Sequence, residues 1–417
     1  MSSSIAADPR ILDSSATTGV RPGRAVMAVG ALLFVSMVPV TLLVAPLKEL
    51  VGDRFGASPF WTHSFMSMNM IGAIMAAPLI GRWSDTRGRR ARVAAWALVA
   101  DAVLLAGMSF APNLIILLAL RCFEGVAHIL AISTLMATAA GWAGEGKRGR
   151  TMGIIGAAMM FGTACGTRMG GAVWRHMGDW TFCFAGAVSL IAAIGVLLTV
   201  AESSEDRRER SKSRSILSLL RQKRELIVPY LYTFVDRFCV GVVISTFVLF
   251  LAEVHDIAPK QRGSLLAMFL VPFALLVYPA GRLVDRVGRA WPIALGSMLF
   301  GLVFAAYGVV EPVRLGWLML ASGVVSAAMF APSLALCADL APQDQRGAAF
   351  TGFNAAGSLG MLMGPIVSGA FFTVTAARLP MENAYAVTFI ATGCAQFLCA
   401  AVTLPLLLRL SRYGVNR

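Results

Sequence analysis

The sequence predicts an all-α integral membrane protein with twelve transmembrane helices in two pseudo-symmetric six-helix bundles. The first observation is composition: hydrophobic residues make up 57% of the chain and charged residues 14%, against about 25% charged residues in soluble domains. The second is that apolar residues occur in runs long enough to cross a bilayer, which takes roughly 20 residues per helix. The third is a motif that occurs twice, 200 residues apart, and indicates an internal duplication.

The apolar runs predict the limits of each helix. The twelve expected spans are 26–48, 61–81, 93–110, 113–140, 151–174, 181–201, 228–251, 263–281, 291–310, 315–338, 347–374 and 384–408. The chain then divides into a polar, disordered cytoplasmic arm, a first bundle, a cytoplasmic linker, a second bundle and a cytoplasmic tail, at 1–24, 25–201, 202–227, 228–410 and 411–417.

The distribution of basic residues predicts the orientation. With both termini in the cytoplasm, 26 of the 36 Lys and Arg residues lie in cytoplasmic segments, and the remaining ten are divided between the outer loops and the spans. This asymmetry is typical of membrane proteins, so the net charge of +14 does not indicate a nucleic-acid partner. Within the linker, the amphipathic run from Ile216 to Leu220 could lie on anionic lipid head groups or belong to a solvated tether.

Motifs of catalysis and cofactor binding are missing from the sequence. The seven cysteines are scattered through apolar segments without the spacing of metal ligands or of a disulfide framework. There is no phosphate-binding loop, zinc pattern, nucleophile elbow or dinucleotide fingerprint. We therefore expect no enzyme activity, no metal and no cofactor, and any uphill transport must draw on an ion gradient or on the substrate's own gradient.

The duplicated motif has the pattern G-x-x-x-D-x-x-G-R and lies between two apolar runs in each half. It predicts a tight basic turn, because glycine adopts turn conformations that other residues avoid. Its aspartate could lie against the positive end of a helix of the other half, or it could merely balance the neighbouring arginines. The candidate gate residues are Gly81, Asp85, Gly88, Arg89 and Arg90 in the first copy, and Gly281, Asp285, Gly288 and Arg289 in the second.

A second repeat lies in the fifth and eleventh spans, 198 residues apart, and Arg148-Gly149 and Arg346-Gly347 precede its two copies at the same spacing. Small residues four apart let helix backbones approach closely in membranes. A twofold repeat of six helices is typical of transporters whose halves rock about a fixed site. The expected packing residues are Gly162, Gly166, Gly170 and Gly171, and Gly360, Gly364 and Pro365.

These motifs resemble those of the major facilitator superfamily over essentially the whole chain. The loop after the second span matches the family signature except at Thr86, and Arg121 to Gly125 resembles its R-x-x-x-G motif. The fifth span resembles the family's antiporter motif, with Thr167 in place of a proline. In the first span, Pro39-Val40 and Pro46-Leu47 are similar to the twelve-helix drug and metabolite exporters.

The resemblance implies a mechanical role for the duplicated loop. In the family, the contact between the loop aspartate and a helix of the other half latches the cytoplasmic side shut. Asp85 would then act opposite the start of the eleventh helix near Arg346, and Asp285 opposite the fifth helix near Arg148.

Charges inside the spans are the candidate coupling residues, because an unpaired charge at mid-bilayer costs at least about 2.5 to 3.5 kcal/mol. Arg121, Glu124 and His128 are spaced i, i+3 and i+7 and share one face of the fourth helix. Glu124 could bind and release a proton on a central cavity beside Arg121, or the two could form a static pair. His128 by itself is more typical of packing.

Four further charges lie in other spans. Arg168 could meet an anionic substrate group, meet Glu124, or reach the outer surface along its own stem. Asp236 is a second candidate proton carrier, and we expect it to point to a different face from Arg237 and not to pair with it. Asp101 is a third carboxylate, expected to contact Arg121 or a neighbouring helix.

We conclude from the sequence that secondary active transport is the function, most simply proton-coupled export of a small amphipathic or anionic compound such as a drug or metabolite. Import or facilitated diffusion is the alternative within transport, and a non-transporting assembly or sensor protein is the alternative outside it. The expected partners are a small-molecule substrate, a proton or other ion gradient and the lipid bilayer. We expect a monomer in a bacterial cytoplasmic membrane with both termini in the cytoplasm.

Overall fold

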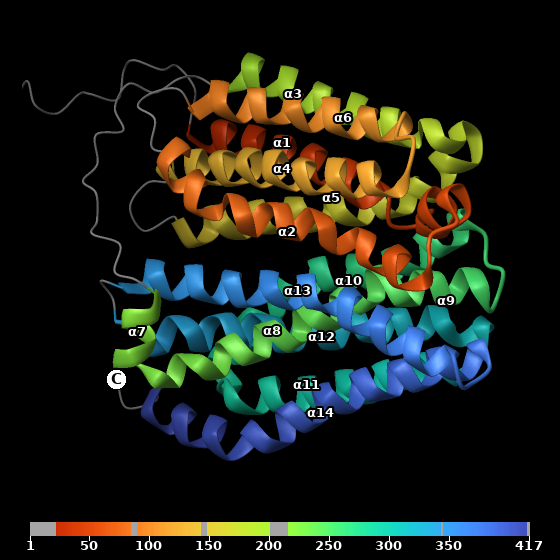
Figure 1. Cartoon of the computed structure of the whole chain (residues 1–417). Coiled ribbons are helices and arrows are strands. Elements are labelled where there is room, and N and C mark those ends of the chain that lie inside the picture. Colours follow the sequence, from red (N-terminus) through yellow and green to blue (C-terminus); the bar gives the residue numbers. More distant parts are fainter. Residues whose placement is uncertain (1–21, 85–89, 143–147, 201–215, 343–344, 415–417) are drawn as a thin grey trace, which may run out of the picture.

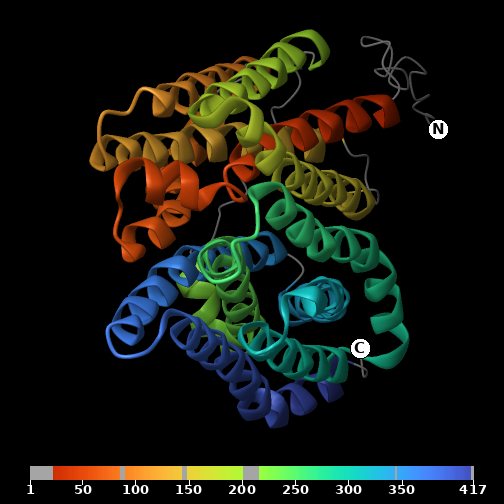
Figure 2. The same cartoon turned by 90° about the vertical axis from the view of Figure 1, so that its right-hand side faces the viewer.

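A computed structural model describes residues 22–84, 90–142, 148–200, 216–342 and 345–414. These residues form helices and connecting turns, without a strand. Figures 1 and 2 show two bundles side by side, the first from the N-terminal half of the chain and the second from the C-terminal half. The predicted fold class, twelve transmembrane helices in two six-helix bundles, is confirmed.

Six long helices form the first bundle. They are α1 (Pro22–Leu42), α2 (Pro59–Ser84), α3 (Arg90–Ser109), α4 (Leu114–Trp142), α5 (Arg148–Met177) and α6 (Thr181–Thr199). A π-helical turn, η2 (Lys48–Asp53), lies between α1 and α2, and a 3-10 turn, η3 (Gly178–Trp180), lies between α5 and α6.

The second bundle repeats this plan. Its first spanning helix is assembled from α8 (Ile227–Val242), the π-helical turn η5 (Val243–Phe247) and α9 (Val248–Glu253). The next five are α10 (Pro259–Val287), α11 (Ala290–Ala305), α12 (Leu315–Leu340), α13 (Arg346–Ala376) and α14 (Met381–Gly414). Short 3-10 turns η4 (Arg224–Leu226), η6 (Ala306–Gly308) and η7 (Pro312–Arg314) join some of them.

Helix ends differ from the expected limits where the backbone gives a reason. The first span was expected to reach residue 48, but α1 ends at Leu42. Pro46 has no N–H to continue the helix and disfavours helical backbone at Ala45. At the other terminus, α14 continues to Gly414, beyond the limit of 410 expected for the second bundle.

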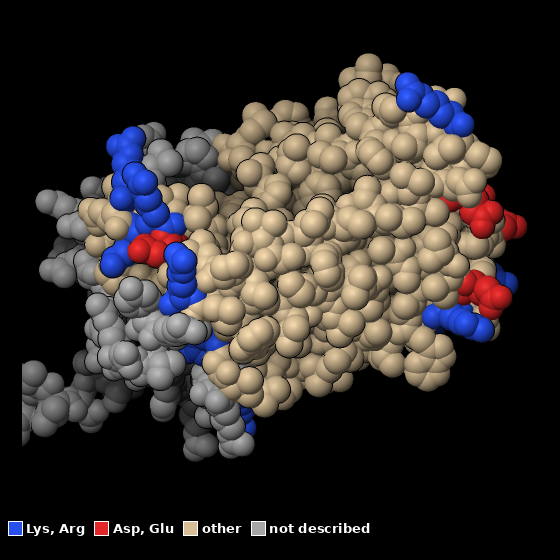
Figure 3. Space-filling view, turned by 90° about the horizontal axis from the view of Figure 1, so that it is seen from below, with Lys and Arg blue, Asp and Glu red and all other residues tan. Residues whose placement is uncertain are grey.

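One face of the molecule has no charged side chains between its two ends (Figure 3). Figure 3 shows one face on which basic and acidic side chains gather at both ends and leave the middle uncharged. Ten stretches of the described helices are long and apolar enough to cross a membrane, and one of them, Ile154–Thr199, covers both α5 and α6. The molecule therefore presents the uncharged band that a bilayer requires.

The same helix pairs pack in both bundles. In the first, α1 packs on α5, α2 on α4 and α3 on α6; in the second, α8 packs on α13, α10 on α12 and α11 on α14. Two pairs cross between the bundles, α2 with α13 and α5 with α10. Each crossing pair is the symmetry counterpart of the other.

Glycines allow the closest of these approaches. The Cβ of any other residue at Gly162, Gly166 or Gly170 would fall on the backbone of α1, and one at Gly360 or Gly364 on the backbone of α8. Pro365 lies beside this second contact, against Gly241 of α8.

Two glycines of the repeat instead face the other bundle. Gly171 of α5 lies against the backbone of Pro259 in α10, and Gly369 of α13 lies against His63 in α2. The two glycines are 198 residues apart, the spacing of the repeat. The bundles therefore meet at two equivalent points.

The two ends of the molecule are called the linker end and the far end. The linker end carries α7 (Ile216–Gln222) and the C-terminal end of α14, on the left of Figure 1; the far end carries α9, on the right. The amphipathic run of the linker forms α7, and its Leu219 is buried in a cluster with α12 and α13 residues.

Candidate functional site

Two oppositely charged side chains are buried inside the first bundle. Arg121 and Glu124 lie on one face of α4, and both are fully buried. Arg121 Nη1 donates a hydrogen bond of 2.9 Å to Glu124 Oε2. Asn69 Nδ2 of α2 donates to the same oxygen at 2.7 Å. Glu124 is thus held by one cationic and one neutral donor.

The close approach of α2 and α4 places Asn69 at this site. The Cβ of any other residue at Gly125 would fall on the backbone of Asn69, and one at Gly72 on the backbone of Cys122. Two glycines facing each other's helix let the backbones meet. The glycine of the R-x-x-x-G motif therefore brings the α2 amide to the carboxylate that lies one residue before it.

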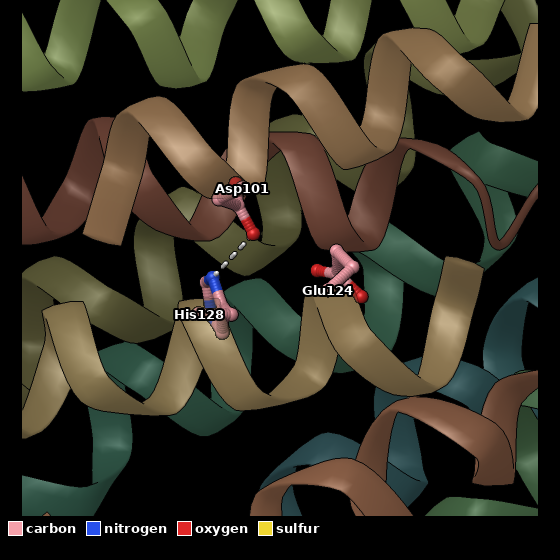
Figure 4. A group of neighbouring side chains, drawn as sticks. All are labelled: Asp101, Glu124 and His128. Carbon is pink, nitrogen blue, oxygen red and sulfur yellow. Dashed lines mark ion pairs between the residues drawn. The ribbon is translucent and has the colours of Figure 1, made fainter. Parts of the chain in front are cut away.

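A second buried carboxylate lies beside the pair. Asp101 of α3 is fully buried and accepts a hydrogen bond of 2.5 Å from Ser189 of α6. His128, one turn beyond Glu124 on α4, is 7% exposed, and its Nδ1 is 3.8 Å from Asp101 Oδ1. Figure 4 shows Asp101, Glu124 and His128 pointing toward one another from two helices.

The three side chains have the geometry of a cation-binding group. One ligand atom from each of Asp101, Glu124 and His128 lies within 4.8 Å of the others. Asp101 Oδ1, Glu124 Oε1 and His128 Nδ1 have no hydrogen-bond partner among the described residues. Such a group can hold a proton.

Asp236 and Arg237 lie in α8 of the second bundle, away from this cluster. Asp236 is buried, and it lines a small pocket with Tyr232, Ser297 and Ser333. The expectation that adjacent residues cannot pair was wrong: Arg237 Nε lies 4.0 Å from Asp236 Oδ2. The length of the arginine side chain allows this contact, and the Arg237 guanidinium also lies over the Phe330 ring at 4.9 Å.

Arg168 lies where α5 meets α10. Its side chain is exposed on α5, and its backbone lies against Gly263 of α10. The structure therefore brings Arg121, Glu124, His128 and Asp101 into one cluster and places Arg168 and Asp236 elsewhere.

The gate residues are only partly described. Asp85, Gly88 and Arg89 lie outside the described residues. The surroundings of four further positions are not described either: Gly81, Asp285, Arg148 and Arg346. Arg90 begins α3.

The second copy of the gate motif shows its turn. Gly288 has a φ of 85°, a conformation that glycine adopts without strain, and Gly281 lies on α10 near Ala331 of α12. Arg289 pairs with Asp339 at the end of α12, in its own bundle.

A charged contact at the far end joins the bundles. Arg262 of α10, 1% exposed, donates Nη1 to Ala45 O at 2.9 Å and pairs with Glu49 of η2. Arg262 Nε also donates to Ile257 O at 2.8 Å. A separate contact between the bundles joins α2 and α13, where Ser67 Oγ donates to Leu362 O at 2.7 Å. We call Arg262, Glu49 and Ala45 the far-end latch.

Sequence reasoning missed several of these residues. Asn69 and Ser189 are uncharged, so a search for charges inside the spans does not find them. The one sequence signal for Asn69 is that it is a polar residue within an apolar span. Glu49 lies just after the first expected span and Arg262 just before the eighth, each in an expected outer loop. A single sequence contains no signal that pairs them, because their contact depends on how the two bundles meet.

Comparisons with known proteins agree on the family. The family model described as Major Facilitator Superfamily matches residues 29–251 and, again, residues 229–415. The chain is 25% identical over 341 residues to a protein of Lactococcus lactis subsp. lactis named as a homolog of the multi-drug resistance efflux pump PmrA, with 79% of this chain and 83% of that protein covered. It is 26% identical over 307 residues to the multidrug resistance protein MdtG of Proteus mirabilis, covering 69% and 74%.

Solved structures share the fold at low identity. A bacterial homolog of the human lysosomal transporter Spinster, in an inward-facing and unoccupied conformation, aligns with a TM-score of 0.78 at 14% identity, covering 96% of this chain and 99% of that one. The nucleoside transporter NupG aligns with a TM-score of 0.76 at 12% identity, covering 92% and 99%.

Proposed function

The chain belongs to the Major Facilitator Superfamily, and we propose that it is a proton-coupled exporter of small amphipathic or anionic compounds such as drugs or metabolites. That it is an integral membrane transporter and no enzyme follows from the family and the fold. The proton coupling, the direction of transport and the class of substrate are the proposal.

The observation that carries the proposal is the fully buried pair of Arg121 and Glu124 in an otherwise apolar bundle. Burying an ion pair seldom stabilises a protein better than apolar packing would, and ionisable groups inside a membrane protein favour a role in the transport cycle. Glu124 is our proposed coupling carboxylate. Arg121 is the cation that it leaves and rejoins as protons and substrate exchange.

Arg121 also supports the class of substrate. Its Nε and Nη2 atoms are buried without a hydrogen-bond partner among the described residues, and its guanidinium lies over the Phe65 ring at 5.3 Å. Unused guanidinium donors beside an aromatic ring suit a ligand with an acceptor or anionic group next to an apolar body.

The direction of export is supported by the relatives named as efflux pumps. With the linker end in the cytoplasm, the far-end latch would close the outer side while a substrate binds from the cytoplasm. Asp85 and Asp285 would close the linker end in the alternate state. We also propose that the protein acts as a monomer in the bacterial inner membrane, with both termini in the cytoplasm.

Everted membrane vesicles test the proposal. We expect an imposed pH gradient, acid inside, to drive accumulation of ethidium or of carboxyfluorescein, which represent cationic and anionic amphipathic compounds. Glu124→Gln should reduce gradient-driven accumulation to the level of vesicles without the protein. Glu311→Gln removes an exposed carboxylate and should leave accumulation unchanged.

Two outcomes would contradict the proposal. If gradient-driven accumulation persists in Glu124→Gln and is lost in Asp236→Asn, the coupling carboxylate lies on α8. If the unmodified protein equilibrates both probes without any response to the pH gradient, it is a facilitator, a function that the resemblance in fold to the nucleoside transporter NupG would also accommodate.

A further inference from the structure

We propose that Asp101 of α3 is a second proton-carrying residue of the coupling centre, and that it holds the proton while Glu124 is paired with Arg121. The inference rests on the proton coupling proposed above. It adds a residue on a different helix to the site and fixes where the proton lies in the conformation described here.

The two carboxyl groups accept hydrogen bonds from donors of different charge. Glu124 Oε2 accepts from the Arg121 guanidinium at 2.9 Å and from Asn69 at 2.7 Å. Asp101 accepts from the neutral hydroxyl of Ser189 at 2.5 Å. The cation at hydrogen-bond distance therefore compensates Glu124, while Asp101 has only a neutral donor at that distance.

The remaining neighbour of Asp101 is His128. Its Nδ1 is 3.8 Å from Asp101 Oδ1, beyond the usual length of a hydrogen bond, and His128 is buried. A histidine that carried the balancing charge would be expected to close on the carboxylate, because charge-assisted hydrogen bonds are short. The geometry points to a neutral histidine beside a protonated Asp101.

Counting the charges of the cluster also indicates that it holds one proton. The ionisable groups near Asp101 are Arg121, Glu124 and His128 of α4. The helix α6, which packs along α3, has no Asp, Glu, Lys, Arg or His. The helix α2 contributes the neutral Asn69. With a neutral His128 the two carboxylates and one guanidinium leave one negative charge. A single proton makes the buried cluster neutral, as burial in an apolar bundle requires.

The unpartnered atoms give this proton a short route. Asp101, Glu124 and His128 each contribute one atom to a group whose atoms lie within 4.8 Å of one another, and each has a buried atom without a hydrogen-bond partner among the described residues. When substrate or the rocking of the bundles draws Arg121 away from Glu124, the O–H bond of Asp101 breaks. The proton then passes to Glu124, directly or through His128. Asp101 is left ionised, and Glu124 becomes neutral.

Infrared spectroscopy of the purified full-length protein tests where the proton lies. A protonated carboxyl group has a C=O stretching band that an ionised one lacks. We expect such a band near neutral pH, and we expect it to shift when aspartate is labelled with carbon-13 in its side-chain carboxyl group. Asp101→Asn should remove the shifted band, whereas Asp236→Asn, which deletes the other buried aspartate, should retain it.

A band that ignores the aspartate label would place the proton on glutamate and overturn the inference. So would a labelled band that survives Asp101→Asn and is lost in Asp236→Asn, or the lack of any protonated-carboxyl band. Ser189→Ala provides a milder variant if Asp101→Asn does not fold: it should move the labelled band without removing it, and an unmoved band would contradict the assignment to Asp101.

The vesicle assay separates this inference from the proposed function. Vesicles that respond to a pH gradient while the infrared band lies on glutamate would refute only the role of Asp101. Vesicles that ignore the gradient would refute proton-coupled export, even if the infrared band lies on Asp101. Coupled accumulation that is lost in Asp101→Asn, together with an Asp101 band, would support both.

Discussion

Gly125 shows how the absence of a side chain can position a charged cluster. Its Cα faces the Asn69 backbone so closely that no Cβ fits, and this contact sets the distance from Asn69 to Glu124. Gly156 on α5 offers a matched control, because a Cβ there would meet nothing within 4 Å.

We therefore predict that Gly125→Ala pushes α2 and α4 apart. The expected cost is about 1–3 kcal/mol of stability, the usual effect of overpacking, together with reduced gradient-driven accumulation in vesicles. Gly156→Ala should change neither. Thermal unfolding followed by tryptophan fluorescence measures the first effect, and equal melting temperatures for the two variants would refute the role given to Gly125.

At the residue scale the sequence predicted part of the cluster. The i, i+3, i+7 spacing placed Arg121, Glu124 and His128 on one helix face, because the spacing and the helix period determine that face. It could not show that Asp101, on another helix, lies against His128. That contact depends on how α3 packs on α4 and α6, which helix period alone does not determine.

Among the elements, η2 and the start of α10 form a charged contact between the bundles at the far end. Arg262 is 1% exposed and Glu49 14% exposed at their side chains. Removing one partner of a buried ion pair is costly, on the order of 3–5 kcal/mol, because the other charge is left uncompensated.

Arg262→Gln should therefore shift the protein toward a state open at the far end. Spin labels on Ser58→Cys and Ala258→Cys, both exposed, should report a longer distance in this variant, measured in a background without other cysteines. Arg314→Gln breaks a pair that is 72% exposed on both sides, worth about 0–1 kcal/mol, and should leave the distance unchanged. Identical distance distributions in all three proteins would contradict the latch.

The spanning helices were predicted well as elements, because an apolar run of sufficient length has few alternatives inside a membrane. Departures occur where the backbone is interrupted. α1 stops before Pro46, and a π-helical turn at Val243–Phe247 divides the first spanning helix of the second bundle. Hydropathy contains no signal for either the turn after Leu42 or this π-helical turn.

At the scale of the whole molecule, orientation in the membrane is the prediction to test. The excess of Lys and Arg in the expected cytoplasmic segments predicts that the linker end lies inside the cell. In a cysteine-free background, Pro380→Cys should react with a membrane-impermeant maleimide added to intact cells. Lys223→Cys, also exposed, should react only after the cells are permeabilised. The reverse pattern would overturn the orientation.

The sequence also predicted the internal duplication, since motif spacings of 198 and 200 residues survive in the chain. It did not predict where the bundles make a charged contact. The contact of Arg262 with Glu49 depends on how the bundles meet, and these residues have no common motif.

The two glycines that face the opposite bundle bear on how such a protein could arise. Gly171 meets α10 and Gly369 meets α2, and these two helices begin at Pro259 and Pro59, 200 residues apart. Each half thus offers the other the same surface that it receives, which is the property of an isologous interface in a C2 dimer. A single six-helix ancestor could already have assembled with its own copy through this seam, so that gene fusion had only to tether two subunits that recognised each other beforehand.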